Sequence, residues 1–158
     1  MNKLYLLFGG LLIFFLFTTN CEEENNCDEL INNLMVKVNF YTIDKGKEVA
    51  IAFDTLAVYG EEFPDSLLYG SKQISNLNLP LSKLSDTSSF VLSYGDISKD
   101  TIQFIYSRKY ELASTTCGYR LQGTIISFST TKNIMDSSFL NNAQVNIENE
   151  ENIKLYTY

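Results

Sequence analysis

The sequence contains no histidine and no tryptophan, and it has only two prolines and three cysteines among 158 residues. Without histidine, Ser-His-Asp and Cys-His catalysis and histidine-ligated metal sites are excluded. Without tryptophan, the chain lacks the largest aromatic side chain for stacking on a sugar ring. Basic residues are outnumbered, 12 against 19 acidic ones, and they form no stripe along the chain. The sequence therefore does not predict nucleic-acid binding.

The remaining polar residues are weak candidates for chemistry. Paired carboxylates can hydrolyse glycosides, but Glu61, Glu62, Asp96 and Asp100 stand in segments that have the composition of solvated loops. A calcium loop alternates acidic residues around a glycine, and no segment matches that pattern. We therefore predict no catalytic residue, no metal site and no cofactor. A carboxylate-based hydrolase is the alternative.

An apolar run from Leu4 to Phe17 follows Lys3 at the start of the chain. A spanning helix needs about 20 residues, so this run has the length of a signal peptide rather than a membrane span. Cys21 follows this run after Thr18, Thr19 and Asn20. It resembles the lipobox cysteine of bacteria, whose thiol is acylated and whose preceding bond is cut, although Asn20 departs from the usual small residue. We predict a signal peptide over residues 1–20 and lipidation of Cys21. The alternatives are a plain signal peptide with Cys21 as a spare thiol, and an uncleaved membrane anchor.

Residues 21–33 are predicted to be a lipidated acidic tether. The acidic residues of this segment are Glu22, Glu23, Glu24, Asp28 and Glu29. Like charges packed so closely favour an extended, solvated segment. Acidic residues behind a lipidated cysteine also resemble the export signal by which some Gram-negative bacteria send lipoproteins to the outer face of the outer membrane. We expect a lipoprotein of the cell envelope, at the outer membrane and exposed at the cell surface.

Lipidation of Cys21 would leave two cysteines, Cys27 and Cys117. Exported thiols oxidise, so these two are expected to form a disulfide. A bridge closing a loop of about 91 residues would stabilise the domain by roughly 4 to 5 kcal/mol. Neither cysteine stands in a C-x-x-C motif, which favours a structural role over a redox or metal role.

Past residue 33 the hydrophobic pattern has a period of two, which is typical of strands. The residues expected to face inward are Leu34, Val36, Val38, Phe40, Leu77, Leu79, Leu81, Phe90, Leu92, Tyr94, Ile102, Phe104, Tyr106, Leu121 and Ile125. Asp44–Lys47 is expected to be a turn, and the interruption at Asp54-Thr55 a bulge or a break. Residues 60–72 are expected to form a loop with one helical turn at 65–68, and residues 134–140 a short helix or an irregular crossing.

Seven or eight strands over residues 34–158 predict a single all-β domain. The fold class is an antiparallel β-sandwich, loosely immunoglobulin-like, and a small β-barrel is the alternative. Several of the ten tyrosines fall at strand ends or opposite the apolar face. Of these, Tyr41, Tyr59 and Tyr119 are the candidate contact surface for a protein or a sugar. Arg108 and Arg120 are expected to pair with acidic residues on neighbouring strands.

Five stretches taken together resemble a family of small lipoproteins of unassigned function from Gram-negative bacteria. They are CDEL at 27–30, VNFY at 38–41, LAVYG at 56–60, LNLPLSKLSDTSSFVLSY at 77–94 and DTIQFIYSRKYELASTTCGYR at 100–120. The resemblance covers nearly all of the mature chain and implies a single β domain behind a lipoprotein signal, with the cysteine pairing. Its motifs are strand patterns plus Cys-Gly-Tyr around Cys117, and they imply no activity.

We expect a non-enzymatic interaction or accessory module that is attached to the membrane through its lipid. Its expected partners are envelope proteins or glycans, and nucleic acid is not among them. The alternative is an extracellular glycan- or ligand-binding module.

Overall fold

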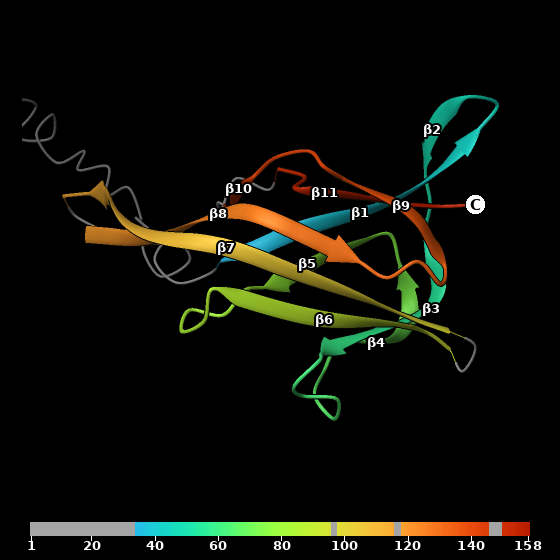
Figure 1. Ribbon diagram of the computed structural model, residues 1–158, viewed down its shortest axis with the longest axis horizontal. Helices are drawn as coiled ribbons and strands as arrows, with labels where there is room; N and C mark the ends of the chain where they lie inside the picture. Colours follow the sequence, from blue (N-terminus) through green and yellow to red (C-terminus); the bar gives the residue numbers. More distant parts are fainter. Residues whose placement is uncertain (1–33, 96–97, 116–117, 146–149) are drawn as a thin grey trace, which may run out of the picture.

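The computed structural model describes residues 34–95, 98–115, 118–145 and 150–158, which form two β-sheets and no helix (Figure 1). The first sheet has the order β2-β1-β11-β9, with β5 beside β1. Its strands are β1 (Met35–Asp44), β2 (Lys47–Ala50), β5 (Asn76–Pro80), β9 (Met135–Leu140) and β11 (Ile153–Thr157). The second sheet has the order β10-β8-β7-β6-β3-β4. Its strands are β3 (Phe53–Gly60), β4 (Leu67–Ile74), β6 (Thr87–Tyr94), β7 (Ser98–Ser114), β8 (Gly118–Thr130) and β10 (Gln144–Val145).

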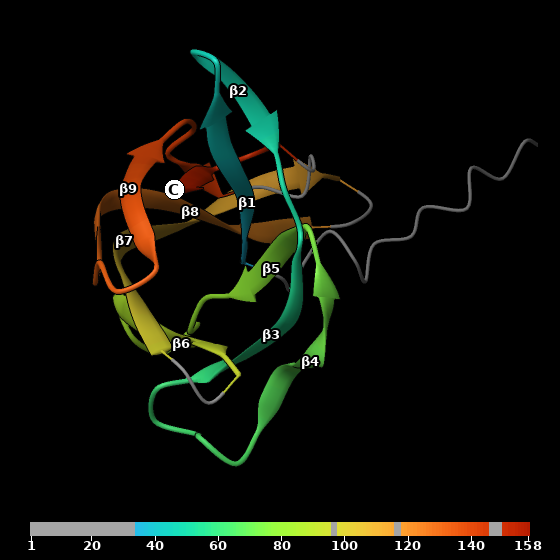
Figure 2. The ribbon, with the colours of Figure 1, turned by 90° about the vertical axis from the view of Figure 1, so that its right-hand side faces the viewer.

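The two sheets face each other across one apolar core, which confirms the predicted β-sandwich. All pairings of the second sheet are antiparallel. This sheet curls strongly when viewed from the end, so the sandwich approaches a half-barrel (Figure 2). The first sheet is mixed, because β1 and β11 pair in parallel from Val38↔Ile153 to Tyr41↔Tyr156.

The predicted inward faces supply the core. Every residue expected to face inward is buried except Leu121, which is half-buried and packs against the core. Aromatic rings contact each other across the two sheets: the centroids of Phe40 on β1 and Phe53 on β3 are 5.0 Å apart. Within the second sheet, the centroids of Phe53 and Tyr94 are 4.9 Å apart. Pro80 ends β5, which within the described ranges pairs only with β1, as expected for a strand with a proline that lacks a backbone donor.

The Asp44–Lys47 turn is confirmed. Lys45 and Gly46 both have positive φ, 50° and 76°, which is the backbone of the tight hairpin turn that matches strand twist. The interruption expected at Asp54-Thr55 is confirmed as an irregularity in the register of β3 with β4 between Phe53 and Leu56. The break between two strands lies at residues 51–52, where the chain leaves the first sheet and enters the second.

Two predictions of local structure are wrong. Residues 67–74 form strand β4 rather than a loop with a helical turn, and residues 135–140 form strand β9 rather than a helix or crossing. In both cases the backbone pairs with a neighbouring strand, β3 for β4 and β11 for β9. Pairing with a partner strand satisfies the backbone and overrides weak local preference. The described part of the chain therefore has eleven strands instead of seven or eight.

Two buried polar residues hold connections between strands. Asp100 on β7 is only 2% exposed, so the expectation that it is a solvated loop carboxylate is wrong. Its two oxygens accept hydrogen bonds from Thr131 Oγ1 and from the backbone N–H groups of Asn133, Ile134 and Met135. These bonds fix the connection from β8 to β9.

Asn152 is 3% exposed and ties β11 to its surroundings. Its Oδ1 accepts a hydrogen bond from Lys37 N, and its Nδ2 donates to the carbonyls of Asn142 and Gln144. A buried amide with three satisfied contacts stabilises this arrangement of strands.

Candidate contact site

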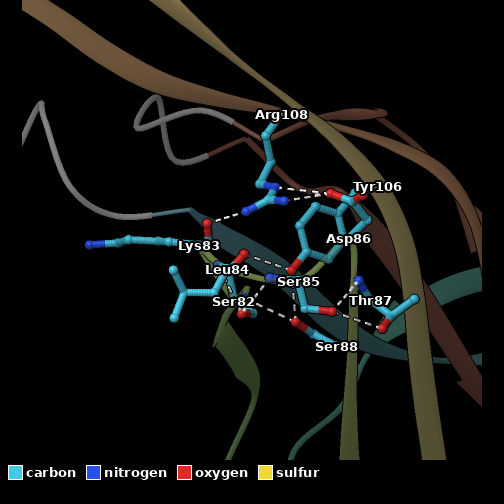
Figure 3. A network of polar contacts seen from close by, with 9 residues as sticks. All are labelled: Ser82, Lys83, Leu84, Ser85, Asp86, Thr87, Ser88, Tyr106 and Arg108. Atoms are coloured by element: carbon cyan, nitrogen blue, oxygen red, sulfur yellow. Dashed lines mark hydrogen bonds and ion pairs between the residues drawn. The ribbon is translucent and has the colours of Figure 1, made fainter.

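The connection from β5 to β6 forms a compact loop closed by its own short side chains (Figure 3). Ser82 Oγ accepts hydrogen bonds from Leu84 N at 3.2 Å and Ser85 N at 3.1 Å. Ser85 Oγ accepts one from Thr87 N at 3.2 Å and lies 3.1 Å from Thr87 Oγ1. Serine and threonine hydroxyls bond to nearby backbone in this way in turns. The sequence SKLSDTS therefore favours a defined loop conformation.

A buried tyrosine fastens the base of this loop. Tyr106 on β7 is 1% exposed, and its hydroxyl donates to the carbonyl of Ser82 at 2.8 Å. The same hydroxyl lies 3.0 Å from Ser88 Oγ, which accepts a hydrogen bond from Ser82 N. The backbone N–H of Tyr106 donates to the carbonyl of Asp86. The loop is thereby connected to β7 at both of its ends.

Arg108, two residues further along β7, holds the outer part of the loop (Figure 3). Its Nε and Nη2 lie 3.1 Å and 2.6 Å from Asp86 Oδ1, and its Nη1 donates to the carbonyl of Lys83. Arg108 pairs with an acidic residue as expected, but Asp86 lies in the loop before β6 and not on a neighbouring strand. An exposed ion pair contributes little stability by itself. Here it adds to a network that fixes the loop's shape.

The loop held by this network carries one apolar side chain, Leu84, that stays exposed. Leu84 is 96% exposed, whereas residues on both sides of it are bonded to the rest of the loop. Single exposed leucines are ordinary on protein surfaces. Leu84 differs because its backbone is held in place while its side chain contacts water. The alternation of apolar and polar residues does not identify Leu84 as a contact residue. The available signal in the sequence is a leucine between Lys83 and Ser85 in an otherwise polar turn.

A second group of polar and aromatic side chains, the outer tyrosine cluster, lies on the outer face of the first sheet. It consists of Asn39, Tyr41, Glu48, Glu151, Lys154 and Tyr156. The rings of Tyr41 and Tyr156 are 5.8 Å apart, as expected from their pairing across β1 and β11. Lys154 Nζ lies 4.9 Å from the centre of the Tyr41 ring. A cation over an aromatic face is attracted by the ring quadrupole.

Two carboxylates complete the outer tyrosine cluster. Lys154 Nζ is 2.6 Å from Glu48 Oε1 and 3.8 Å from Glu151 Oε1. The hydroxyls of Tyr41 and Tyr156 donate to Glu151 and Glu48, respectively. The hydrogen bond with Lys154 lowers the pKa of Glu48 and raises that of Lys154. The hydrogen bond to Glu151 raises the pKa of Tyr41, and the pKa of Tyr156 is raised by burial and then by its bond to Glu48.

The structure places the three predicted contact tyrosines apart. Tyr41 is in the first sheet, within the outer tyrosine cluster. Tyr59 is on β3 of the second sheet, with Lys99 Nζ 5.8 Å from its ring centre. Tyr119 is on β8, which is separated from β3 by β7 and β6, and it pairs with Leu112 near the far end of β7. The three do not form one surface, and their role in contacts stays a prediction.

The other predicted residues are placed as follows. Glu61 and Glu62 are exposed after β3, and the β7–β8 register sets Arg120 opposite Glu111. Within the described ranges, no three metal-ligating side chains stand close enough to hold an ion, and no helix has the length and hydrophobicity to cross a membrane. The signal peptide, the lipidation site Cys21, the tether and the Cys27–Cys117 pair lie outside the described residues.

A scan against models of protein families matches residues 55–157 to the family described as Family of unknown function (DUF6452). The matched segment contains Leu84, the side chains that hold its loop, and Lys154 and Tyr156 of the outer tyrosine cluster. Tyr41 and Glu48 precede it. No curated protein and no solved structure matches the chain.

Proposed function

The chain belongs to the family of unknown function DUF6452, and we propose that it is a non-enzymatic interaction module of the cell envelope that binds a protein through Leu84. The observation that carries this proposal is the 96% exposure of a leucine whose loop is fixed by the hydroxyls of Ser82, Ser85 and Tyr106 and by Arg108. Because the backbone of this loop is already fixed, the loop loses little further conformational entropy on binding. The exposed Leu84 side chain is therefore presented in a form suited to insertion into an apolar pocket of a partner.

The expected gain can be estimated from the side chain itself. Complete burial of a leucine side chain contributes about 1.5 to 3 kcal/mol, which corresponds to roughly a tenfold to hundredfold change in Kd. Lys83 is exposed beside Leu84, so an acidic group at the rim of the partner's pocket would complement it. Residues that contribute most to binding lie in well-packed, desolvated pockets near the centre of protein interfaces.

The envelope location is proposed from the sequence. The apolar leader, Cys21 and the acidic tether together support a lipid-anchored protein at the outer membrane, and several acyl chains hold a protein to a membrane almost permanently. The family match begins after this region and does not bear on it. Labelled palmitate should enter the protein, and Cys21→Ala should abolish the labelling. Undiminished labelling of the variant would exclude this anchor.

The contact itself is tested by affinity purification from detergent-solubilised membranes. We expect a partner protein to be recovered in stoichiometric amount with the native chain. The recovered amount should fall at least tenfold with Leu84→Ser. Ile43→Ser is the matched control, because Ile43 is an exposed apolar residue of the β1–β2 hairpin. Recovery of the same partner by Leu84→Ser, or its equal loss in both variants, would exclude Leu84 as the contact residue.

The outer tyrosine cluster favours a second candidate function, binding of an extracellular glycan. Two adjacent tyrosine rings next to carboxylates provide an aromatic face with polar groups around it, a combination that suits a sugar ring with its hydroxyls. Retention on a polysaccharide array, abolished by Tyr156→Ala and unaffected by Leu84→Ser, would favour this function. Retention that Tyr156→Ala leaves unchanged would exclude the cluster as the site.

A further inference from the structure

The β3–β4 connection and the start of β4 carry a patch of exposed apolar side chains. Phe63, Leu67 and Leu68 are 65%, 55% and 42% exposed. The backbone of this connection is held by hydrogen bonds, since Phe63 N donates to the carbonyl of Gly60 and Ser66 N donates to the carbonyl of Phe63. The Phe63 ring also lies against Gly60, where an added Cβ would be 3.6 Å from its Cδ2 atom. The patch is therefore presented on a loop of defined shape.

Three carboxylates stand among these apolar side chains. Glu61, Glu62 and Asp65 are exposed, and none of them forms an ion pair within the described part of the chain. The sequence has no lysine or arginine from position 59 to position 71. Unpaired surface carboxylates favour a partner that brings a cation to them. We refer to residues 60–68 as the acidic apolar loop.

The loop that carries Leu84 has the complementary character. Leu84 is 96% exposed, and the neighbouring Lys83 is exposed as well. Asp86, the acidic residue of this loop, is paired with Arg108. The ammonium of Lys83 forms no ion pair with a described residue. An apolar side chain next to a cation matches an apolar surface that is edged by carboxylates.

Both loops lie at the same end of the β3–β6 pair. β3 ends at Gly60, which pairs with Phe90 of β6, and Glu61 N donates to the carbonyl of Ser89. The Leu84 loop leads directly into β6, which begins at Thr87. Each copy of the chain therefore carries both complementary loops near one end. Two copies related by a two-fold axis can then make the same contact twice, which closes the assembly as a dimer.

We propose that the partner of Leu84 is a second copy of this chain, with Lys83 and Leu84 of each copy docked on the acidic apolar loop of the other. This inference rests on the proposed function, because it names the partner of the same site. Charge complementarity favours a second copy as the occupant. The ammonium of Lys83 meets the carboxylates of the acidic apolar loop, and Leu84 meets its apolar side chains.

The pairing is tested with two differently tagged copies of the full chain, expressed together and purified through one tag from detergent-solubilised membranes. We expect the second tag to be recovered with the first. Lys83→Glu in both copies should lower this recovery at least tenfold, because one substitution removes both symmetric contacts, and Glu62→Lys should do the same. Both changes in one chain should restore the recovery, because the two charges are exchanged. Lys132→Glu is the matched control, since Lys132 is exposed before β9, and it should have no effect.

The other results overturn the proposal in ways that can be told apart. Absence of the second tag, or a recovery that Lys83→Glu and Glu62→Lys leave unchanged, would exclude a pair of copies held by these loops. Loss in both single variants without restoration in the double variant would exclude their direct contact. Recovery of a different protein, lost with Leu84→Ser, would overturn this inference and leave the proposed function intact. If Leu84→Ser changes no recovery at all, the proposed function fails as well.

Discussion

Replacement of Asp100 by asparagine should strongly destabilise the domain. The carboxylate of Asp100 is buried and accepts four hydrogen bonds between 2.8 and 3.0 Å, one from Thr131 Oγ1 and three from backbone N–H groups. An amide has one oxygen in place of two and carries two N–H donors. At most two of the four bonds can therefore survive in Asp100→Asn, and the new NH₂ group faces either two backbone N–H donors or one such donor and the Thr131 hydroxyl.

The size of the effect follows from the number of bonds lost. Hydrogen bonds to a charged group contribute about 1.5 to 3 kcal/mol each, so the loss of two amounts to roughly 3 to 6 kcal/mol. Domains of this size have unfolding free energies of roughly 5 to 15 kcal/mol. Asp100→Asn should therefore remove a large fraction of the stability, and the connection from β8 to β9 should be the first part to lose its structure.

Urea unfolding followed by far-UV circular dichroism measures this loss, with the midpoint expected to fall and the m-value to stay constant. Asp65→Asn is the matched control, because Asp65 is exposed between β3 and β4, and its effect should stay within about 0.5 kcal/mol. A loss below about 1 kcal/mol for Asp100→Asn would refute the argument that this carboxylate holds the connection.

Three further substitutions test other contacts. Tyr94→Phe should leave stability at pH 7 unchanged or raise it by up to about 1 kcal/mol, because the buried Tyr94 hydroxyl has no hydrogen-bond partner among the described residues. Burial and the Asp100 carboxylate raise the pKa of Tyr94 in the folded protein. Proton binding at Tyr94 therefore contributes to the free energy of unfolding, fully below about pH 10, the ordinary pKa of tyrosine, and less as the pH rises above it. Urea titrations at alkaline pH should show less of this loss for Tyr94→Phe than for the native chain. Asn152→Ala should cost about 2 to 4 kcal/mol in urea unfolding, since three hydrogen bonds are lost. Tyr106→Phe should lower the free energy of unfolding by about 1 to 3 kcal/mol, because the bonds of its hydroxyl are lost. Amide hydrogen exchange should become faster at Leu84 and stay unchanged in β11. Equal acceleration at both places would contradict a local effect.

The parts of the fold that could be predicted from the sequence are those with strict alternation. The runs that contain Val36, Leu79, Leu92 and Phe104 place one set of side chains in the core, and the structure buries all of them. Strand β9 could not be predicted in this way, because Phe139 faces solvent and the strand exists through its pairing with β11. Local sequence contains little information on such long-range pairing.

The candidate site was harder to predict than the fold. The stretch that contains Leu84 was singled out only as part of a family-like pattern, since the exposure of one leucine depends on bonds from Tyr106 and Arg108, more than twenty residues away. The prediction for Asp100 is wrong for a similar reason. Its hydrogen-bond donors follow β8, about thirty residues later in the chain, and a carboxylate next to a turn has the same composition whether it is solvated or buried. The sequence pattern places the candidate tyrosines at strand ends or opposite the apolar face but does not contain the strand order, which separates them.

The most direct test of the proposed contact is site-specific photocrosslinking in intact cells, with p-benzoylphenylalanine placed at position 84 or at position 43 of the full chain. We predict one discrete protein adduct from position 84 and none from position 43. The absence of an adduct at position 84, or the same adducts at both positions, would contradict a binding role for Leu84.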